Sequence, residues 1–419
     1  MPKLYRLTGP EQRYARRRSR RRRRAAALGR PLRRVPRDHR LRLPAEEGPQ
    51  EYDDEPERIA DRYGAFDGGD LVSVCGHYDL TANLRGEWVS MAGLAAVATP
   101  PERRRKGYVR ALIDDALERW RGKFPLAALW PFSRSYYAQF GWATANTYTE
   151  YTCPPDQLAF ARGAVDGEAR PASADDWRDL QAVHEAQAGE TSLALRRSSE
   201  AWWRERVLRE DDEDRPWAYV YERDGEARGY LVYSFEDLGG PKHMNQRLTV
   251  ADAAAANHDA WLGMLGFLAD HDSQASEVRL RSDARTDLLD LVSDPEAVDC
   301  EVKTGPMARI VDVADALSAC PYPADVSAEL TLRVTDETAA WNDGQFRLAV
   351  SDGSGTVTAD ASGDPDATVG IGTLSQLVVG YHDVEAARRI GDLSLADGGI
   401  ADALAALFPP ERTYLRTFF

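Results

Sequence analysis

Residues 88–142 hold the pattern that most restricts the fold of this chain. The apolar run from Met91 to Ala98 is short enough for a buried strand, and Thr99-Pro100-Pro101 ends it because proline cannot donate to a sheet ladder. A basic segment with one glycine, residues 103–107, then leads into a pattern with apolar residues on one helical face: Val109, Leu112, Ile113, Ala116 and Leu117. The sequence therefore predicts a strand, a basic loop and a helix in that order.

A basic, glycine-containing loop at the start of a helix is suited to holding a phosphate group. The first amides of a helix have no partner inside it and the dipole there is positive, while glycine lets the backbone approach a ligand closely. A second apolar run, Leu126 to Trp130, and a tyrosine-rich segment, Ser135 to Trp142, follow the helix. Together these segments predict an α/β unit with an anion site at its first strand–helix junction.

The motifs of this unit resemble those of GNAT N-acetyltransferases. The segment Arg104-x-x-Gly107-x-Val109 is similar to the acetyl-CoA pyrophosphate loop of that family, Q/R-x-x-G-x-G/A, although Val109 stands where the pattern asks for Gly or Ala. The Tyr-x-x-Phe-Gly-Trp segment at 137–142 resembles the strand–helix end of the fold, where a tyrosine commonly serves as general acid. Arg-x-x-Gly alone is a weak signal, whereas all these segments in this order and spacing are a strong one.

Length and composition indicate several globular domains in a reducing compartment. A chain of 419 residues is long enough for about two to four domains that each bury a core. It contains no run of about 18 apolar residues, and no apolar stretch of a signal peptide follows the charged N-terminus. The four cysteines, at 75, 153, 300 and 320, show no metal or redox spacing. We therefore expect a cytoplasmic protein without a bound metal.

The net charge of −15 is distributed unevenly. Residues 1–50 carry a net charge of +13 and the remainder −28, and only five of the 53 basic residues are lysine. An acidic, lysine-poor body is typical of proteins kept soluble in molar salt, where screening removes self-repulsion. The composition therefore predicts a halophilic, haloarchaeal protein, and GC-rich coding DNA is the alternative explanation.

The arginine-rich segment 1–44 has almost no core-forming periodicity. It is open to three interpretations: a disordered tail or a segment outside the natural reading frame, an irregular element of the fold, or an arm that binds nucleic acid by counterion release. No aromatic residues alternate with the arginines, and molar salt would weaken such an arm, so the sequence argues against a nucleic-acid partner.

The remaining chain divides into three parts by composition and pattern. Residues 45–160 form the unit described above, and 161–305 repeat a strand–helix order without an Arg-x-x-Gly-x-Gly loop. In that second part Ser173 is a candidate N-cap, and Asp224-Gly225 lies in a hairpin signal. Residues 306–419 combine alternating strands with Asp/Gly turns and a helical segment at 374–381, and they resemble a sterol carrier protein domain. The apolar end, Thr417-Phe418-Phe419, should be docked rather than solvated.

This order of parts closely resembles the enhanced-intracellular-survival (Eis) acetyltransferase family over residues 45–419. The resemblance implies a mixed α/β fold class, with two tandem GNAT-type domains followed by a sterol-carrier-like α+β domain. It implies that the Phe419 carboxylate is the general base and Tyr137 the general acid, and that acetyl-CoA is the co-substrate. The implied cofactor contacts are Ala96, Val97, Ala98, Arg104, Arg105, Lys106, Gly107, Tyr108, Val109, Phe132 and Ser133. It also implies a homo-oligomer, a hexamer of two trimers.

The chemistry of amine acetylation is compatible with these roles. An amine at neutral pH is mostly ammonium, so a base must remove its proton before it attacks a thioester. No His or Glu stands in the central motif, and a carboxylate from elsewhere is required. Tyr137, with a reference pKa of about 10, suits protonation of a thiolate of pKa about 8.5 or above. His77 is a further candidate base, although a lone histidine on a strand is more often a packing residue.

A function of a different class remains open at this point. The C-terminal part could bind a lipid, with the acetyltransferase parts as a non-catalytic scaffold. A free apolar tunnel in 307–419 would favour this alternative, and a C-terminus inserted into the first domain would argue against it. For the enzyme, the acidic body suits a cationic acceptor such as a polyamine, an aminoglycoside or a protein lysine.

Overall fold

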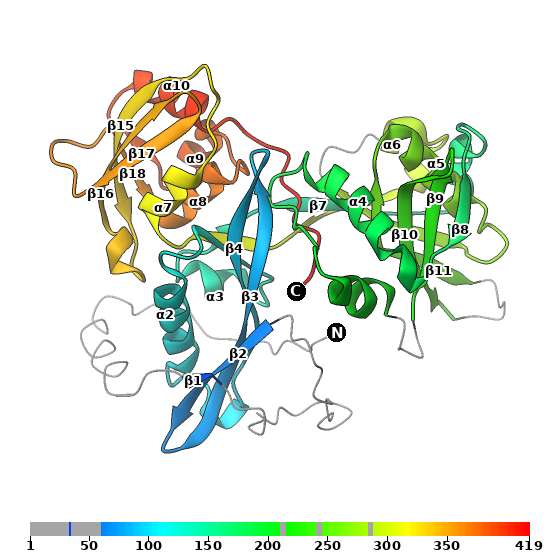
Figure 1. The fold of residues 1–419 in the computed structure, drawn as a ribbon, viewed down its shortest axis with the longest axis horizontal. Coiled ribbons are helices and arrows are strands. Elements are labelled where there is room, and N and C mark those ends of the chain that lie inside the picture. The colour runs from blue at the N-terminus through cyan, green and yellow to red at the C-terminus, as the bar shows by residue number, and fades with distance from the viewer. Residues whose placement is uncertain (1–32, 35–59, 210–214, 240–244, 284–287) are drawn as a thin grey trace.

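The structure, a computed structural model, describes residues 33–34, 60–209, 215–239, 245–283 and 288–419 (Figure 1). The described strands form three sheets of seven, seven and five strands. The segment 1–44 lies outside the described residues except for Arg33–Arg34, which form strand β1 against β2. Two sheets with helices and a smaller third sheet match the predicted mixed α/β architecture.

The first sheet has the strand order β1-β2-β3-β4-β5-β14-β6. Strands β3 (Asp70–Leu84) and β4 (Glu87–Ala98) form a long hairpin. Its turn residues, Arg85 and Gly86, both have positive φ, as a two-residue type I′ turn requires. The other strands are β2 (Ala60–Asp67), β5 (Leu126–Leu129), β6 (Ala143–Thr144) and β14 (Met307–Ile310).

Helix α2 (Tyr108–Trp120) covers one face of the first sheet. Its buried residues recur every three or four positions, so one apolar stripe packs on alternate residues of β4 and β5, including Leu94 and Leu129. The short helix α3 (Arg134–Ala138) contributes Tyr137 to the same core. The predicted sequence of strand, loop, helix and strand is confirmed.

The second sheet has the order β13-β7-β12-β11-β10-β9-β8. The predicted hairpin is present, because β9 (Trp217–Arg223) and β10 (Glu226–Asp237) are joined by Asp224 and Gly225, both with positive φ. Ser173 caps a short helical turn, Ala174–Asp176, that leads into α4 (Trp177–Ala188). The remaining elements are β7 (Thr147–Cys153), β8 (Glu168–Pro171), β11 (Gln246–Ala255), α5 (His258–Ala269), β12 (Glu277–Asp283), α6 (Leu288–Leu291), β13 (Asp299–Thr304) and a π-helix at Trp202–Leu208.

The first two sheets exchange strands. Strand β14 follows the second sheet in the chain but lies in the first sheet between β5 and β6. Strand β7 follows the first sheet in the chain but lies in the second, between β12 and β13. Each of the first two sheets therefore contains one strand that the chain order would place with the other, at residues 147–153 and 307–310.

The third sheet has the order β17-β16-β15-β18-β19, with β15 and β18 parallel. Helix α8 (Ile371–Val378) lies between this sheet and the first one and touches β14, β6, β15 and β18. The other elements are α7 (Val313–Ala319), β15 (Ala328–Thr335), β16 (Gly344–Ser351), β17 (Ser354–Ala359), β18 (Ala367–Gly370), α9 (Val384–Ile390), β19 (Ser394–Leu395) and α10 (Gly398–Leu407).

After α10 the chain leaves the third domain as an extended tail, residues 408–419. In Figure 1 the tail, in red, passes between the two larger sheets and ends beside β3 and β4. Phe419 is 4% exposed, so the predicted docking of the C-terminus is confirmed. Within the described residues, no helix is both long enough and apolar enough to span a membrane.

A fully buried ion pair joins the first and third domains. Arg309 of β14 donates from Nη2 to Asp336 Oδ2 at 2.5 Å, and the two side chains are 0% and 1% exposed. Asp336 also accepts hydrogen bonds from the backbone amides of Thr338 and Ala339. Burial lowers the pKa of Arg309, and the adjacent Asp336 opposes that shift.

Replacing Arg309 with methionine should leave a buried carboxylate without its cation. We expect Arg309→Met to lower the free energy of unfolding by about 3–5 kcal/mol, measured by urea denaturation. The control is Arg333→Met, which removes an exposed pair with Asp343 and should cost no more than about 1 kcal/mol. Equal losses in the two variants would contradict the role given to the buried pair.

Candidate active site

The site begins where the parallel strands β4 and β5 part. They pair from Met91 with Leu126 to Leu94 with Leu129, and β4 then continues to Ala98 without β5. A bulge against β3 follows at once, between the pairs Gly76–Ala95 and Val74–Ala98, and Ala96 has φ of +48°. The predicted contacts Ala96, Val97 and Ala98 therefore lie on a strand segment that no longer pairs with β5.

The basic loop joins the end of β4 to the start of α2. Arg105 and Gly107 both have positive φ, and Gly107 is the N-cap residue of α2. A glycine N-cap brings no side chain to the first turn, and that turn contains no acidic residue. Because free helix amides and a positive dipole attract anions, this helix start is suited to a phosphate.

The side chains of this loop face different surroundings. Lys106 and Arg105 are exposed, while Val109 is half-buried. Arg104 is half-buried, and its Nε donates to the carbonyl of Thr99 at 3.1 Å. Tyr108 is buried below the helix, and its hydroxyl donates to Asp67 at 2.5 Å, which raises the pKa of Tyr108. Only the backbone amide of Tyr108 is therefore available to a bound anion.

Tyr137 lies on α3, directly after β5. Its ring packs edge-on against Phe132 and Tyr136, each with ring centroids 5.4 Å away, and the residue is 3% exposed. Burial raises the pKa of Tyr137, and the nearby Tyr136 adds to the shift. Among the described residues its hydroxyl forms no hydrogen bond, so it can serve a ligand. Ser133, the N-cap of α3, is half-buried with its Oγ 3.3 Å from that of Ser135.

Phe419 approaches the same strands from the opposite face. Its ring lies against Tyr78, with centroids 5.5 Å apart, and a Cβ on Gly93 would lie 2.7 Å from its Cε2 atom. Trp130 links the tail to the end of β5, because its Nε1 donates to the carbonyl of Thr417 at 3.0 Å and its ring packs near that of Phe418.

The two predicted catalytic residues thus flank one pair of strand ends. Tyr137 shares a core with Ala92 and Leu94 on one face of β4. Phe419 shares a core with Met91 on the other face. In the part of the chain that the structure describes, the terminal carboxylate forms no ion pair or hydrogen bond.

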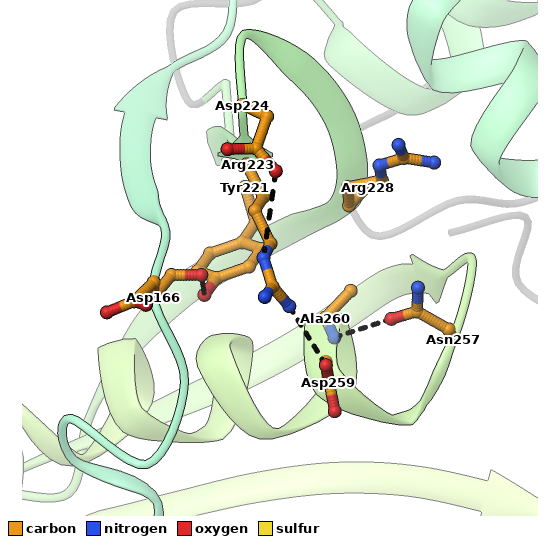
Figure 2. A pocket seen from close by; sticks show the side chains of 8 residues that line it. All are labelled: Asp166, Tyr221, Arg223, Asp224, Arg228, Asn257, Asp259 and Ala260. Atoms are coloured by element: carbon orange, nitrogen blue, oxygen red, sulfur yellow. Dashed lines mark hydrogen bonds and ion pairs between the residues drawn. The ribbon is translucent and has the colours of Figure 1, made fainter.

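The second sheet contains a related strand–helix junction with different chemistry. Strand β11 leads to α5, and a pocket of about 240 Å³ lies beside the start of that helix (Figure 2). Asn257 caps α5 by accepting from the amide of Ala260 at 2.9 Å, and Asp259 pairs with Arg223. Asp166 and Asp224 add two further carboxylates to the lining. A capped helix start surrounded by carboxylates is poorly suited to a pyrophosphate.

No group of three or more His, Cys, Asp or Glu side chains within the described ranges could hold a metal ion.

Several residues that contact the C-terminal tail, above all Arg197 and Asp252, could not be predicted from the sequence. The sequence offered one signal for the docked tail, which is Gly93. Glycine inside a strand often marks the close approach of another chain segment, and Phe419 lies against Gly93.

Family models match three segments of the chain. Acetyltransferase (GNAT) domain models match residues 42–145 and 193–310, and a sterol carrier protein domain model matches 313–416. N-acetyltransferase Eis proteins of Mycobacterium tuberculosis and Mycobacterium bovis are 26% identical over 367 residues, covering 84% of this chain and 86% of theirs. The chain therefore contains two GNAT domains followed by a sterol carrier protein domain.

Solved structures have the same fold. A GCN5-related N-acetyltransferase from Anabaena variabilis is 24% identical with a TM-score of 0.75, covering 85% of this chain and 89% of that one. Eis1 from Mycobacterium abscessus is 24% identical with a TM-score of 0.70, covering 85% and 90%. At this identity the two structures establish the fold.

His77 is a packing residue rather than part of the parted strands. Its ring stacks on Tyr63 at 4.3 Å and lies 4.9 Å from Trp120 under α2. Burial, assisted by the Arg119 charge, lowers the pKa of His77 to about 4. Between pH 4 and 6.5 the folded protein thus keeps this histidine neutral, whereas the unfolded chain would protonate it.

This depressed pKa should make stability depend on pH. Between pH 6.5 and 4 the unfolded state binds the additional proton, so stability should fall as the pH is lowered, by up to about 3 kcal/mol from this one group. His77→Phe should flatten the decline in denaturation midpoint over that window. His258→Phe, at an exposed position, should leave it unchanged, and an equally steep decline in His77→Phe would contradict the assignment.

Proposed function

We propose that this Eis-like GNAT N-acetyltransferase moves the acetyl group of acetyl-CoA to a primary amine by direct attack. Tyr137 would act as general acid and the terminal carboxylate of Phe419 as general base. The observation that carries this proposal is the insertion of the last residues of the chain into the first domain, against the strand ends that also adjoin Tyr137.

The cofactor would lie along the parting of β4 and β5. Backbone groups of Ala96–Ala98 would pair with the pantetheine arm, and the loop 104–109 would hold the pyrophosphate. The free start of α2, with its glycine cap and exposed Lys106 and Arg105, supports this assignment. Phe132 and Ser133, which precede Tyr137, would lie beside the cofactor near the thioester.

The terminal carboxylate would take the proton of the acceptor ammonium, directly or through a water molecule. An α-carboxyl group has a reference pKa of about 3.5, so in water it would be a weak base. The ring of Phe419 packs beside Tyr78 in an apolar core, and exclusion of water from the nearby carboxylate would raise its basicity. The freed amine would then attack the thioester carbonyl, forming the C–N bond as the C–S bond breaks. The nitrogen loses a second proton to water in this step, and the sulfur leaves as a thiol once it has gained a proton.

Tyr137 would stabilise the departing coenzyme A sulfur. Its raised pKa keeps the phenol protonated at neutral pH, so an O–H donor is always available. The same shift weakens the phenol as an acid, and hydrogen bonding to the developing thiolate would therefore contribute along with proton transfer.

The acceptor, assembly and cellular setting belong to the same proposal. We expect a cationic primary amine, because the chain outside residues 1–50 carries a net charge of −28. A hexamer in the cytoplasm follows from the resemblance to the Eis family, and sedimentation or light scattering would test the assembly. A halophilic origin would make activity rise towards molar KCl.

The lipid-binding alternative has less support. It requires the acetyltransferase domains to be a non-catalytic scaffold, yet the tail of the third domain ends inside the first of them. The first domain also keeps a helix start without a side-chain cap close to its parted strands.

A matched pair of glycine variants tests the pyrophosphate loop. Gly107 and Gly122 flank α2 with φ of +91° and +70°, and neither would bring a new Cβ within 4 Å of another atom. Changing either to alanine should cost about 1 kcal/mol of stability through backbone strain. Only Gly107→Ala should weaken acetyl-CoA binding, measured by titration calorimetry. Equal affinity in the two variants would remove the loop from the cofactor site.

The catalytic roles are tested by coenzyme A release with a panel of polyamines, aminoglycosides and lysine peptides, in dilute buffer and in molar KCl. Tyr137→Phe and a chain extended by two glycines beyond Phe419 should each lower kcat by about 10²-fold or more while acetyl-CoA still binds. Added formate should restore part of the activity of the extended chain, because it supplies a mobile carboxylate.

Tyr136→Phe is the control for the first variant, since it removes a hydroxyl from the neighbouring position of the same helix. Its kcat should stay close to that of the unchanged chain. Full turnover by the extended chain would exclude the terminal carboxylate as base, and full turnover by Tyr137→Phe would exclude the tyrosine as acid.

A further inference from the structure

The strands of the second GNAT domain part in the same way as those of the first. Strands β11 and β12 pair in parallel from Arg247 with Glu277 to Thr249 with Arg279. Strand β11 then continues to Ala255 past a register shift opposite Val232 and Tyr233. Beyond Arg279 the described residues of β12 pair with β7 and no longer with β11. Strands β4 and β5 of the first domain show the same order of parallel pairing, parting and bulge.

In the second domain a carboxylate stands on each strand beyond the parting, and each holds an arginine of the C-terminal tail. Asp252 on β11 pairs with Arg416, whose Nε lies 3.5 Å from Oδ1. Asp283 at the end of β12 accepts a hydrogen bond from Nε of Arg412. The tail thus crosses from one parted strand to the other.

The tail backbone is fixed over the same stretch. Ser192 donates its amide to the carbonyl of Arg412 at 2.8 Å and accepts from the amide of Tyr414 at 3.0 Å. Asn146 accepts from the amide of Leu415 at 3.1 Å. These bonds hold the tail in an extended form, with alternate side chains directed at the second domain.

Arg197 forms the inner end of this contact. Its side chain is 4% exposed, pairs with Asp252, and donates to Thr417 Oγ1 from Nε at 3.1 Å and from Nη2 at 2.8 Å. Burial alone would raise the pKa of Asp252, but the charges of Arg197 and Arg416 outweigh it and hold the pKa well below its usual range. The two arginines therefore favour the ionised form of Asp252.

His184 adds a polar contact to the tail. Its Nε2 lies 2.7 Å from the carbonyl of Leu195 and must donate to it, so Nδ1 is free to accept from Nη2 of Arg416 at 3.0 Å. Burial, together with the charges of Arg197 and Arg416, lowers the pKa of His184, which keeps the ring neutral as this bond requires.

We infer that the parted strands of the second GNAT domain, which in the first domain belong to the cofactor site, serve here to hold the C-terminal tail and so position the Phe419 carboxylate. Arg197, Asp252 and Asp283 are positioning residues that act through Arg412, Arg416 and Thr417. The inference rests on the proposed role of the terminal carboxylate as base.

The geometry explains why this anchor controls the end of the chain. Thr417 is held from two sides, by Arg197 on its hydroxyl and by Trp130 on its carbonyl. Only Phe418 and Phe419 follow it, and two residues span at most about 7 Å. A tail fixed at 417 therefore confines the carboxylate to a small region beside β4, whereas a released tail could move over a much larger one.

Release of Phe419 by carboxypeptidase A tests the anchor without relying on catalysis. The full-length variants are Arg412→Gln and Arg416→Gln in the tail and Asp252→Asn in the second domain. Arg416→Gln leaves the Arg197–Asp252 pair intact and so guards against loss of the fold. Carboxypeptidase A should release Phe419 from each variant at least about tenfold faster than from the unchanged chain, because each variant loses a contact with a largely buried partner.

The control is Arg223→Gln, which removes an exposed pair with Asp259 in the same domain, away from the tail. It should release Phe419 at the original rate. In the double variant Asp252→Asn/Arg416→Gln, the increase in the rate of Phe419 release should be smaller than the product of the increases in the two single variants. The two changes break the same contact, so their effects should not multiply. Protection of Phe419 equal to that of the unchanged chain in all tail variants would overturn the anchor.

Kinetics on the same variants separate the anchor from the proposed mechanism. Faster release of Phe419 together with a kcat lowered at least about tenfold would support both the anchor and the role of the carboxylate as base. The dissociation constant for acetyl-CoA should stay unchanged in these variants, because the proposed pyrophosphate loop lies in the first domain. Fast release with an unchanged kcat would support the anchor and exclude the carboxylate as base. A lowered kcat without faster release would overturn the anchor as the cause.

Discussion

The site depends on the place where β4 and β5 cease to pair. The two strands pair with each other up to Leu94 and Leu129, and beyond that point β4 continues along β3 through a bulge that contains Ala96. Backbone groups that leave a ladder inside a protein need another partner. A ligand with amide groups can supply it, and the start of α2, which has no side-chain cap, follows the same strand after the basic loop. The parted strands, the basic loop and the start of α2 are therefore placed to contact one extended ligand.

The two GNAT domains share one backbone arrangement and surround it with different side chains. In the first, the helix after the parted strand has glycine as its N-cap and no acidic residue in its first turn. In the second, Asn257 caps the helix, Asp259 lies in its first turn, and the strands beyond the parting carry Asp252 and Asp283. Those carboxylates disfavour a phosphate but suit arginine. The same strand arrangement therefore adjoins a helix start without acidic residues in the first domain and contacts the arginines of the tail in the second.

Local patterns made much of this fold predictable from the sequence. The apolar run at 91–98, the glycine after four basic residues and the spacing of Leu112, Ile113 and Leu117 determine strand, loop and helix over short distances. The hairpin at Asp224-Gly225 and the docked Phe419 follow from turn chemistry and hydrophobicity in the same way. The strand exchange and the contacts of Arg197 could not be predicted, because they join residues far apart in the chain and leave no periodic signal.

The exchange of β7 and β14 affects how the protein can be made. Met307 of β14 pairs with Thr144 of β6, 163 positions earlier, so the first sheet cannot close until the chain has been synthesised past residue 310. Domains of a multidomain protein generally fold one after another as they leave the ribosome. Here the two acetyltransferase domains must instead mature together, with β5 and β6 waiting as unpaired edges. During that interval the open edges of β5 and β6 can pair with a wrong strand.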